Sequence, residues 1–155
     1  MPVSFSFFAD DAVLACRCAG ILGYDEIVGA YRGTYETLED WPHLTELADY
    51  SDVERLDVPT DLMRDLAERK ATWLEHRGKS ANTVIIAPRD KLFGQARAYG
   101  IQAAFCGPES VCVARDLDEA AEMIGLDPAQ VAGFFNHPAH ILAQSAGHAR
   151  LMTCG

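Results

Sequence analysis

The chain has 155 residues, 49% hydrophobic and 23% charged, which is enough to bury one ordinary globular core. Its 23 acidic residues against 13 basic ones give a net charge of −10, which disfavours nucleic acid and anionic membrane surfaces as partners. Five cysteines without a secretory signal predict reduced thiols in a cytoplasm of bacterial type, and no run approaches the ~18 apolar residues of a membrane span.

Strand patterns come first along the chain. Val3–Phe8 alternates apolar and small residues, and a second apolar run, Ala12–Ala19, follows a short acidic turn. We therefore expect a β-hairpin that is closed by Gly20. A helical spacing begins at Asp25 and is expected to end at Trp41-Pro42, with a shared apolar face made of Ile27, Tyr31, Tyr35 and Leu38.

The middle of the chain predicts a strand, a turn and a long helix. His43–Tyr50 is the strand, and the acidic turn that follows leads through Pro59 into a helix over Thr60–Arg77. Lys70 lies on the apolar stripe of this helix. We expect its long side chain to carry the ammonium out to solvent.

The next segments alternate between strand and helix. Ala81–Ala87 is a continuous apolar run, which is typical of a central parallel strand. A helix is expected from Lys91 to about Ala104, then a strand over Ser110–Ala114. Asp116 and Glu119 have the spacing of a capping box at the start of a further helix.

The order of these elements predicts an α/β fold with a mixed, largely parallel five-stranded sheet and an N-terminal β-hairpin. We assign residues 1–125 to this domain and residues 126–155 to a C-terminal helical extension. Asp127-Pro128 is expected to start the first helix of the extension, and a second is expected through Ile141 and Leu142.

Several segments together resemble a known family: the turn and helix of Leu56–Glu68, Val84–Ala87, Phe93-Gly94-Gln95-Ala96-Arg97, and Arg115–Ala120. Over residues 2–125 the chain is similar to bacterial STAS-like proteins, which have the SpoIIAA-like fold of anti-sigma-factor antagonists. That fold is related in architecture to CRAL-TRIO lipid-binding domains.

The resemblance implies a phosphorylated serine in the turn before the second helix. Here Asp57 takes the place of the motif's aspartate, but Val58 and Pro59 replace the two serines, so the phosphoacceptor is missing. Thr60 is interpreted as the cap of the helix. Binding of an anion to this helix start, or phosphorylation of Thr60, is opposed by Asp57 and Asp61.

The resemblance implies a non-enzymatic regulatory module that binds a protein partner and needs no cofactor. The binding face carried over by motif position consists of Asp57, Thr60, Asp61, Arg64, Phe93, Gly94 and Arg97. A local basic group at the start of the third helix could bind an anion or lie in solvent, and it is made of Arg89, Lys91, Gly94 and Arg97.

Two other functions stay open. A small apolar ligand or lipid could bind under a lid formed by Val131–Leu142, or the chain could be an enzyme of unrecognised type, although it has no nucleophile elbow and no phosphate-binding loop. The partner could also be a second copy of the chain. The contact would then be a C-terminal apolar stripe of Phe134, Phe135, Ile141 and Leu142.

Other motifs have simpler interpretations. Asp10, Asp11 and Asp49 suggest the acidic site of a receiver domain, but a strand follows where a receiver has a helix. Cys16 and Cys18 are expected to be small buried side chains rather than zinc ligands. Two further hypotheses have less support. One is a redox pair of Cys106 and Cys112, and the other is a metal site in the tail made of His137, His140, His148 and Cys154.

Overall fold

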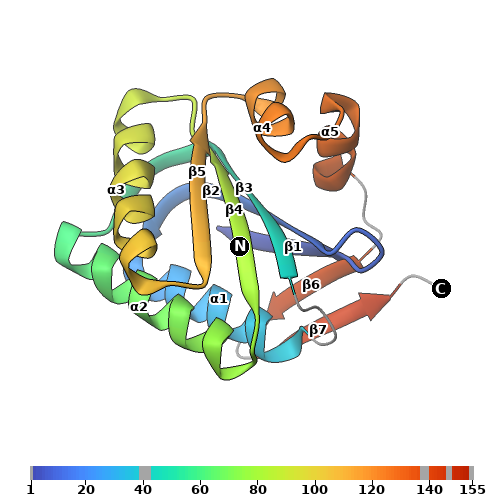
Figure 1. The fold of residues 1–155 in the computed structure, drawn as a ribbon, viewed down its shortest axis with the longest axis horizontal. Helices are drawn as coiled ribbons and strands as arrows, with labels where there is room; N and C mark the ends of the chain where they lie inside the picture. Colours follow the sequence, from blue (N-terminus) through green and yellow to red (C-terminus); the bar gives the residue numbers. More distant parts are fainter. Residues whose placement is uncertain (1, 39–42, 137–139, 146–147, 154–155) are drawn as a thin grey trace.

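The computed structural model describes residues 2–38, 43–136, 140–145 and 148–153 (Figure 1). Its strands are β1 (Val3–Phe8), β2 (Val13–Gly23), β3 (His43–Asp57), β4 (Ser80–Ile86), β5 (Glu109–Ala114), β6 (His140–Ser145) and β7 (His148–Thr153). Its helices are α1 (Tyr24–Thr37), α2 (Thr60–His76), α3 (Asp90–Cys106), α4 (Leu117–Ile124) and α5 (Pro128–Asn136).

All seven of these strands join one sheet in the order β5-β4-β3-β2-β1-β6-β7. Strands β2 to β5 are parallel and each pairs with the next in the chain, whereas β1 is antiparallel to β2. The predicted α/β class, the mixed and largely parallel arrangement of the first five strands, and the N-terminal hairpin are therefore confirmed. The buried pattern of β4 also confirms its central position.

The C-terminal segment differs from its prediction. The expected helix through Ile141 and Leu142 is wrong, because these residues lie in β6 and pair with Ser6 and Phe5 of β1. The free edge of β1 offers backbone hydrogen bonds to a segment that is far away in sequence, and local periodicity contains no sign of such a partner. Strand β7 then pairs with β6.

Helices cover the two faces of the sheet unequally (Figure 1). One face packs against α1, α2 and α3 in the larger hydrophobic core, and α4 and α5 pack on the other face around Leu47, Val84 and Val131. Phe134 does not form a free stripe, because its ring lies 4.9 Å from that of Phe8. Phe134 is thus partly covered, whereas the side chains of Ile141 and Leu142 lie outside the described residues, so the predicted dimer contact stays a prediction.

The ends of two elements correct or confirm local predictions. Strand β3 continues beyond Tyr50 to Asp57, because it stays paired with β2 through two register shifts. The expectation that Thr60 caps α2 is wrong: Pro59 is the N-cap, and no side chain caps this helix. At α4, by contrast, the Asp116 carboxylate accepts a hydrogen bond from the backbone N–H of Glu119 at 2.8 Å, as predicted.

Candidate functional site

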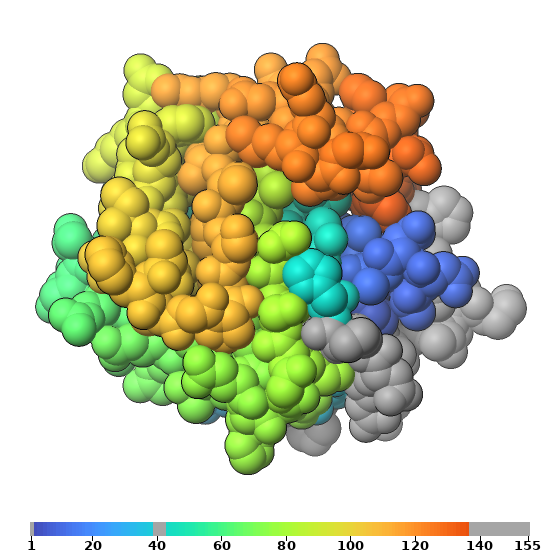
Figure 2. Space-filling model, viewed as in Figure 1, coloured from blue at the N-terminus to red at the C-terminus, as the bar shows by residue number. Residues whose placement is uncertain are grey.

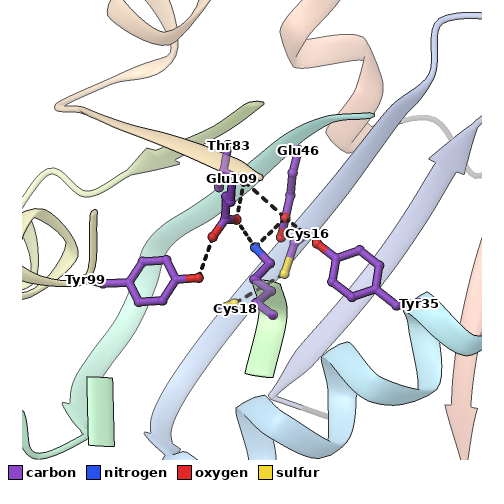
Figure 3. Close-up of polar contacts among 8 residues, drawn as sticks. Cys16, Cys18, Tyr35, Glu46, Thr83, Tyr99 and Glu109 are labelled. Atoms are coloured by element: carbon purple, nitrogen blue, oxygen red, sulfur yellow. Dashed lines mark hydrogen bonds and ion pairs between the residues drawn. The ribbon is translucent and has the colours of Figure 1, made fainter. Parts of the chain in front are cut away.

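A charged cluster is buried between the sheet and the helices α1 to α3 (Figure 3). Lys70 of α2 is only 2% exposed, so the expectation that it reaches solvent is wrong. Its ammonium lies 2.7 Å from Oε2 of Glu46 on β3 and also contacts Oε2 of Glu109 on β5. One cation therefore joins two carboxylates that come from separate strands.

Three hydroxyl groups complete the cluster. Tyr35 donates to Oε2 of Glu46 at 3.1 Å, and Tyr99 donates to Oε1 of Glu109 at 2.6 Å. The Thr83 hydroxyl lies 2.7 Å from Glu109 Oε2 and 3.3 Å from Glu46 Oε2. The cluster consequently ties together α1, β3, α2, β4, α3 and β5.

The environment of the cluster shifts the pKa values of its lysine and tyrosine side chains. Burial lowers the pKa of Lys70, but the attraction of Glu109 and Glu46 outweighs burial and holds that pKa above its usual value. Burial, followed by the nearby carboxylates, raises the pKa values of Tyr35 and Tyr99. The geometry thus favours a protonated lysine and neutral phenols that hold the elements together.

An interior cavity of about 40 Å³ lies beside this cluster. Its polar lining comes from Tyr31, Tyr50, Lys70, Thr83, Gln95 and Tyr99. Ordinary ligand pockets measure about 300–1,000 Å³, whereas a cavity of this size suits a small number of water molecules. The cavity beside the cluster is therefore much smaller than an ordinary ligand pocket.

The cysteines with described side chains are all free thiols. Cys16 and Cys18 are buried with their sulfur atoms 3.6 Å apart, and burial raises the pKa of Cys16. Their interpretation as small core side chains agrees with this burial. Within the described residues, no group of three or more His, Cys, Asp or Glu side chains is placed to hold a metal ion. Of the tail metal residues, His137 and Cys154 lie outside the described residues, as do the side chains of His140 and His148.

The predicted face falls into separate parts. Asp57 ends β3 and forms an ion pair with Arg55 at 2.7 Å. On α2, Thr60 and Asp61 are exposed, and Arg64 is also exposed and pairs with Glu68. These α2 residues do not line either of the two surface grooves that flank α3.

Helix α3 divides the remaining predicted residues between those two grooves. Arg89 and Lys91 line a groove of about 280 Å³ at the carboxyl ends of β2 and β3. Phe93 and Arg97 line a second groove of about 400 Å³ between α3 and β5, which we call the edge groove. Gly94 is exposed on α3 between these two pairs. The basic residues that were predicted to form one patch are therefore divided between two grooves.

The edge groove is apolar and lies beside the last strand of the sheet. Figure 2 shows α3 and β5 next to each other at the molecular surface. The groove is lined by Phe93, Arg97, Gly100, Ile101, Ala104, Val111 and Val113. Ile101 is 57% exposed, and Phe105, one helical turn further along α3, is 84% exposed. The Arg115 guanidinium stacks on the Phe93 ring at 3.9 Å and pairs with Asp90.

Ile101 and Phe105 were not among the residues predicted from the sequence. Their spacing of four residues places them on one side of α3, away from its buried stripe of Leu92, Ala96, Tyr99 and Ala103. A second apolar stripe on one helix was the available signal. It marks a surface that the core of this chain leaves uncovered.

Comparison with known proteins adds no family to this description. No protein-family model matches the chain, and no curated protein or solved structure matches it. Among the described helices, none combines the length and the apolar character that crossing a membrane requires.

Proposed function

We propose that this chain is a non-enzymatic regulatory module of STAS-like type that binds a protein partner. The partner contributes an extended apolar segment, which lies in the edge groove between α3 and β5. The observation that carries this proposal is the groove itself: an open apolar surface that runs beside a sheet edge and includes Ile101. Uncovered apolar surfaces of this kind mark interaction sites.

The edge strand explains why the partner segment is extended. Strand β5 pairs with β4 on one side and is the end of the seven-stranded order on the other. Backbone groups at a sheet edge can pair with an incoming strand, while neighbouring pockets select its side chains. Val111 and Val113 of this edge strand line the groove.

The charge of the residues that line the edge groove indicates which kind of partner segment fits there. Arg97 is the one charged residue among those lining the edge groove, and no described side chain forms an ion pair with it. The remainder of the chain is strongly acidic, with a net charge of −10. A partner segment that combines apolar residues with one carboxylate therefore complements the groove better than a basic segment does.

The STAS-like part of the proposal is supported by topology. Strands β2 to β5 follow one another in both chain and sheet, and β1 adds antiparallel to β2, as the resemblance implies. The turn before α2 contains Val58 and Pro59, so partner binding is not switched by a serine there. The lipid-binding alternative is less favoured, because the described interior cavity has a volume of only about 40 Å³.

Affinity capture with three forms of the chain tests the proposal. The wild type is compared with Ile101→Asp, which places a charge in the edge groove, and with Met123→Asp as the matched control. Met123 is a 44% exposed apolar residue on α4, outside the groove. We expect a protein that is captured by the wild type and by Met123→Asp but not by Ile101→Asp. Equal capture by all three forms, or capture of no protein, would reject the edge groove as the binding site.

A further inference from the structure

The free edge of β5 has the properties that the proposed partner segment needs. Its residues 111–114 are extended and contain no charged side chain. The exposed apolar side chains of Ile101 and Phe105 lie on α3, which packs beside this strand. A second copy of the chain therefore supplies an extended apolar segment of the required kind.

The backbone of β5 directs alternate residues toward the free edge. The carbonyl oxygens of Pro108 and Ala114 point to the β4 side of the strand, where they accept backbone hydrogen bonds. Successive residues of a strand direct their backbone groups to opposite sides. The N–H and C=O groups of Glu109, Val111 and Val113 therefore point away from β4, to the edge.

These groups determine the register of an antiparallel pairing between two copies. When Val111 pairs with Val111 of the second copy, Glu109 of each copy lies opposite Val113 of the other, and all three residues exchange backbone hydrogen bonds. The neighbouring registers need the N–H of Arg115 or of Gly107, and both groups already donate within the chain. The pairing about Val111 is therefore favoured.

The same twofold axis aligns the two copies of α3. Gly100 is level with Val111, since a Cβ atom at Gly100 would lie 3.4 Å from the Val111 side chain. Phe93 and Gly107 are equally far from Gly100 along the chain, so Phe93 of one copy comes level with Gly107 of the other. A Cβ atom at Gly107 would lie 3.5 Å from Oε1 of Glu75. The exposed Glu75 of one copy thus faces the Phe93 end of the other copy's edge groove.

That end of the edge groove is basic. Arg97 is one helical turn from Phe93, and the Arg115 guanidinium stacks on the Phe93 ring. Arg115 pairs with Asp90, whereas Arg97 forms no ion pair with a described residue. Glu75 of the second copy supplies the carboxylate that complements Arg97, and a twofold axis repeats this contact.

We propose that the partner in the edge groove is a second copy of this chain, which pairs its β5 antiparallel to the first about a twofold axis at Val111. The inference rests on the proposed function, because it names the partner of the same groove. The two sheets join into one, and the side chains of Ile101 and Phe105 are covered across the axis. This contact is at the opposite end of the strand order from the C-terminal dimer contact that the sequence predicts.

Sedimentation velocity over a dilution series measures the self-association. We expect the wild type to form a dimer with a dissociation constant at or below about 10 μM, and Ile101→Asp to weaken it at least about tenfold. Ile21→Asp is the matched control, because Ile21 is a 47% exposed apolar residue on β2, away from this edge, and it should dimerise like the wild type. Circular dichroism reports whether each variant is folded. A monomeric wild type, or a dimer that Ile101→Asp leaves intact, would overturn the inference.

Charge substitutions test how the two copies are arranged. Each copy has a net charge of −10, so Glu75→Lys reduces the general repulsion between copies and on that ground alone would strengthen association. The proposed contact predicts the opposite, because a positive charge then faces Arg97 of the other copy. We expect Glu75→Lys to weaken the dimer about fivefold and Arg97→Glu in the same chain to restore it. Unchanged or tighter association in Glu75→Lys would contradict the antiparallel arrangement.

A disulfide bond tests the register. Pairing about Val111 places Cys112, an exposed free thiol, opposite Ser110 of the second copy. The Cα atoms of such a non-hydrogen-bonded pair are about 4.5 Å apart, within the range that a disulfide spans. With oxidised glutathione, Ser110→Cys should therefore give a covalent dimer on a non-reducing gel, and Ser110→Cys/Cys112→Ser should not. A covalent dimer in both variants, or in neither, would rule out this register.

The inference and the proposed function can fail separately. A chain that stays monomeric but captures another protein through Ile101 supports the proposed function and overturns the inference. A chain that neither dimerises nor captures a protein overturns both.

Discussion

The ammonium of Lys70 and the carboxylate of Glu46 lie 2.7 Å apart in a region that neither side chain shares with solvent. They come from a helix and a strand that are 24 residues apart in the chain. Glu109 makes the second contact with the same ammonium. The interior of this protein is therefore held partly by charge, and its stability should respond to changes in that charge.

Replacing Lys70 with methionine keeps the apolar stem but leaves two buried carboxylates without a cation. We expect the free energy of unfolding to fall by about 3–5 kcal/mol, which is typical when one partner of a buried ion pair is removed. Urea denaturation measures the effect. Arg69→Met, which breaks the exposed pair with Asp65, should change stability by less than about 1 kcal/mol.

The carboxylates should account for most of this loss. Adding Glu46→Gln and Glu109→Gln to Lys70→Met removes the buried charges that the first substitution leaves unpaired, so the triple variant should recover part of the lost stability. If Lys70→Met and Arg69→Met had equal effects, the cluster would contribute nothing beyond an ordinary surface pair.

High pH should destabilise the protein. Burial raises the pKa values of one thiol and four phenols, those of Cys16, Tyr31, Tyr35, Tyr50 and Tyr99. For Lys70, the attraction of the carboxylates outweighs burial and also raises the pKa. In each of these groups the folded state therefore favours the protonated form. Their contribution is complete below the unfolded-state pKa values, about 8.5 for a thiol, 10 for a phenol and 10.4 for lysine. Above each value the unfolded chain loses a proton that the folded chain keeps, so stability falls by up to about 1.4 kcal/mol per pH unit and group.

Urea titrations between about pH 8 and pH 11 measure this slope. Tyr35→Phe and Tyr99→Phe each remove one titrating phenol, so the decline of stability above about pH 10 should be less steep in these variants than in the wild type. A free energy of unfolding that stays constant over the whole interval would contradict the assignment of a raised pKa to these groups.

The two helix starts should respond differently to the loss of a side-chain oxygen. Asp116→Ala removes the carboxylate that caps α4 and should cost about 1 kcal/mol. Thr60→Ala should be nearly neutral, because the Thr60 hydroxyl caps no helix. Thermal or urea unfolding of both variants checks the comparison. A greater loss of stability in Thr60→Ala than in Asp116→Ala would indicate that Thr60 caps α2, as the sequence suggested.

Two glycines provide a similar comparison. Gly94 is in the interior of α3, and a Cβ atom there would meet no atom within 4 Å, so Gly94→Ala should stabilise the fold by about 0.5–1 kcal/mol. Gly125 ends α4 with a φ of +70°, so Gly125→Ala should be destabilising. If Gly94 contributed flexibility to the partner-binding face, Gly94→Ala would weaken partner binding while it raised stability.

The periodicity of the first 125 residues predicted most of the fold, because its helices and parallel strands carry their own local patterns. The buried cluster could not be predicted in this way. Lys70 was recognised on an apolar stripe, but its two partners lie in strands whose meeting point depends on the complete sheet order. A glutamate between Thr45 and Leu47 in a buried strand was the signal that could have suggested a buried ion pair.

The extended β3 and the added β6 were missed for related reasons. Asp49, Asp52 and Glu54 make the second half of β3 look like a surface loop, yet β3 stays paired with β2 as far as Asp57, with Glu54 left unpaired at a register shift. The apolar pair Ile141 and Leu142 is too short to show whether the period is that of a helix or of a strand. The predicted binding residues are exposed except for Phe93, which is half-buried. Sequence patterns could not show that α3 directs Arg89 and Lys91 into one groove and Phe93 and Arg97 into another.

The sequential order of strands β2 to β5 has a consequence for how the chain folds during synthesis. Glu46 and Lys70 are both translated before residue 80, so their ion pair can form while the later strands are still absent. Glu109 is translated 39 residues after Lys70 and joins only when β5 adds to the edge of β4. Before Glu109 is translated, Lys70 has at most one of its two counter-charges, and the second becomes available only with the last strand of the parallel sheet.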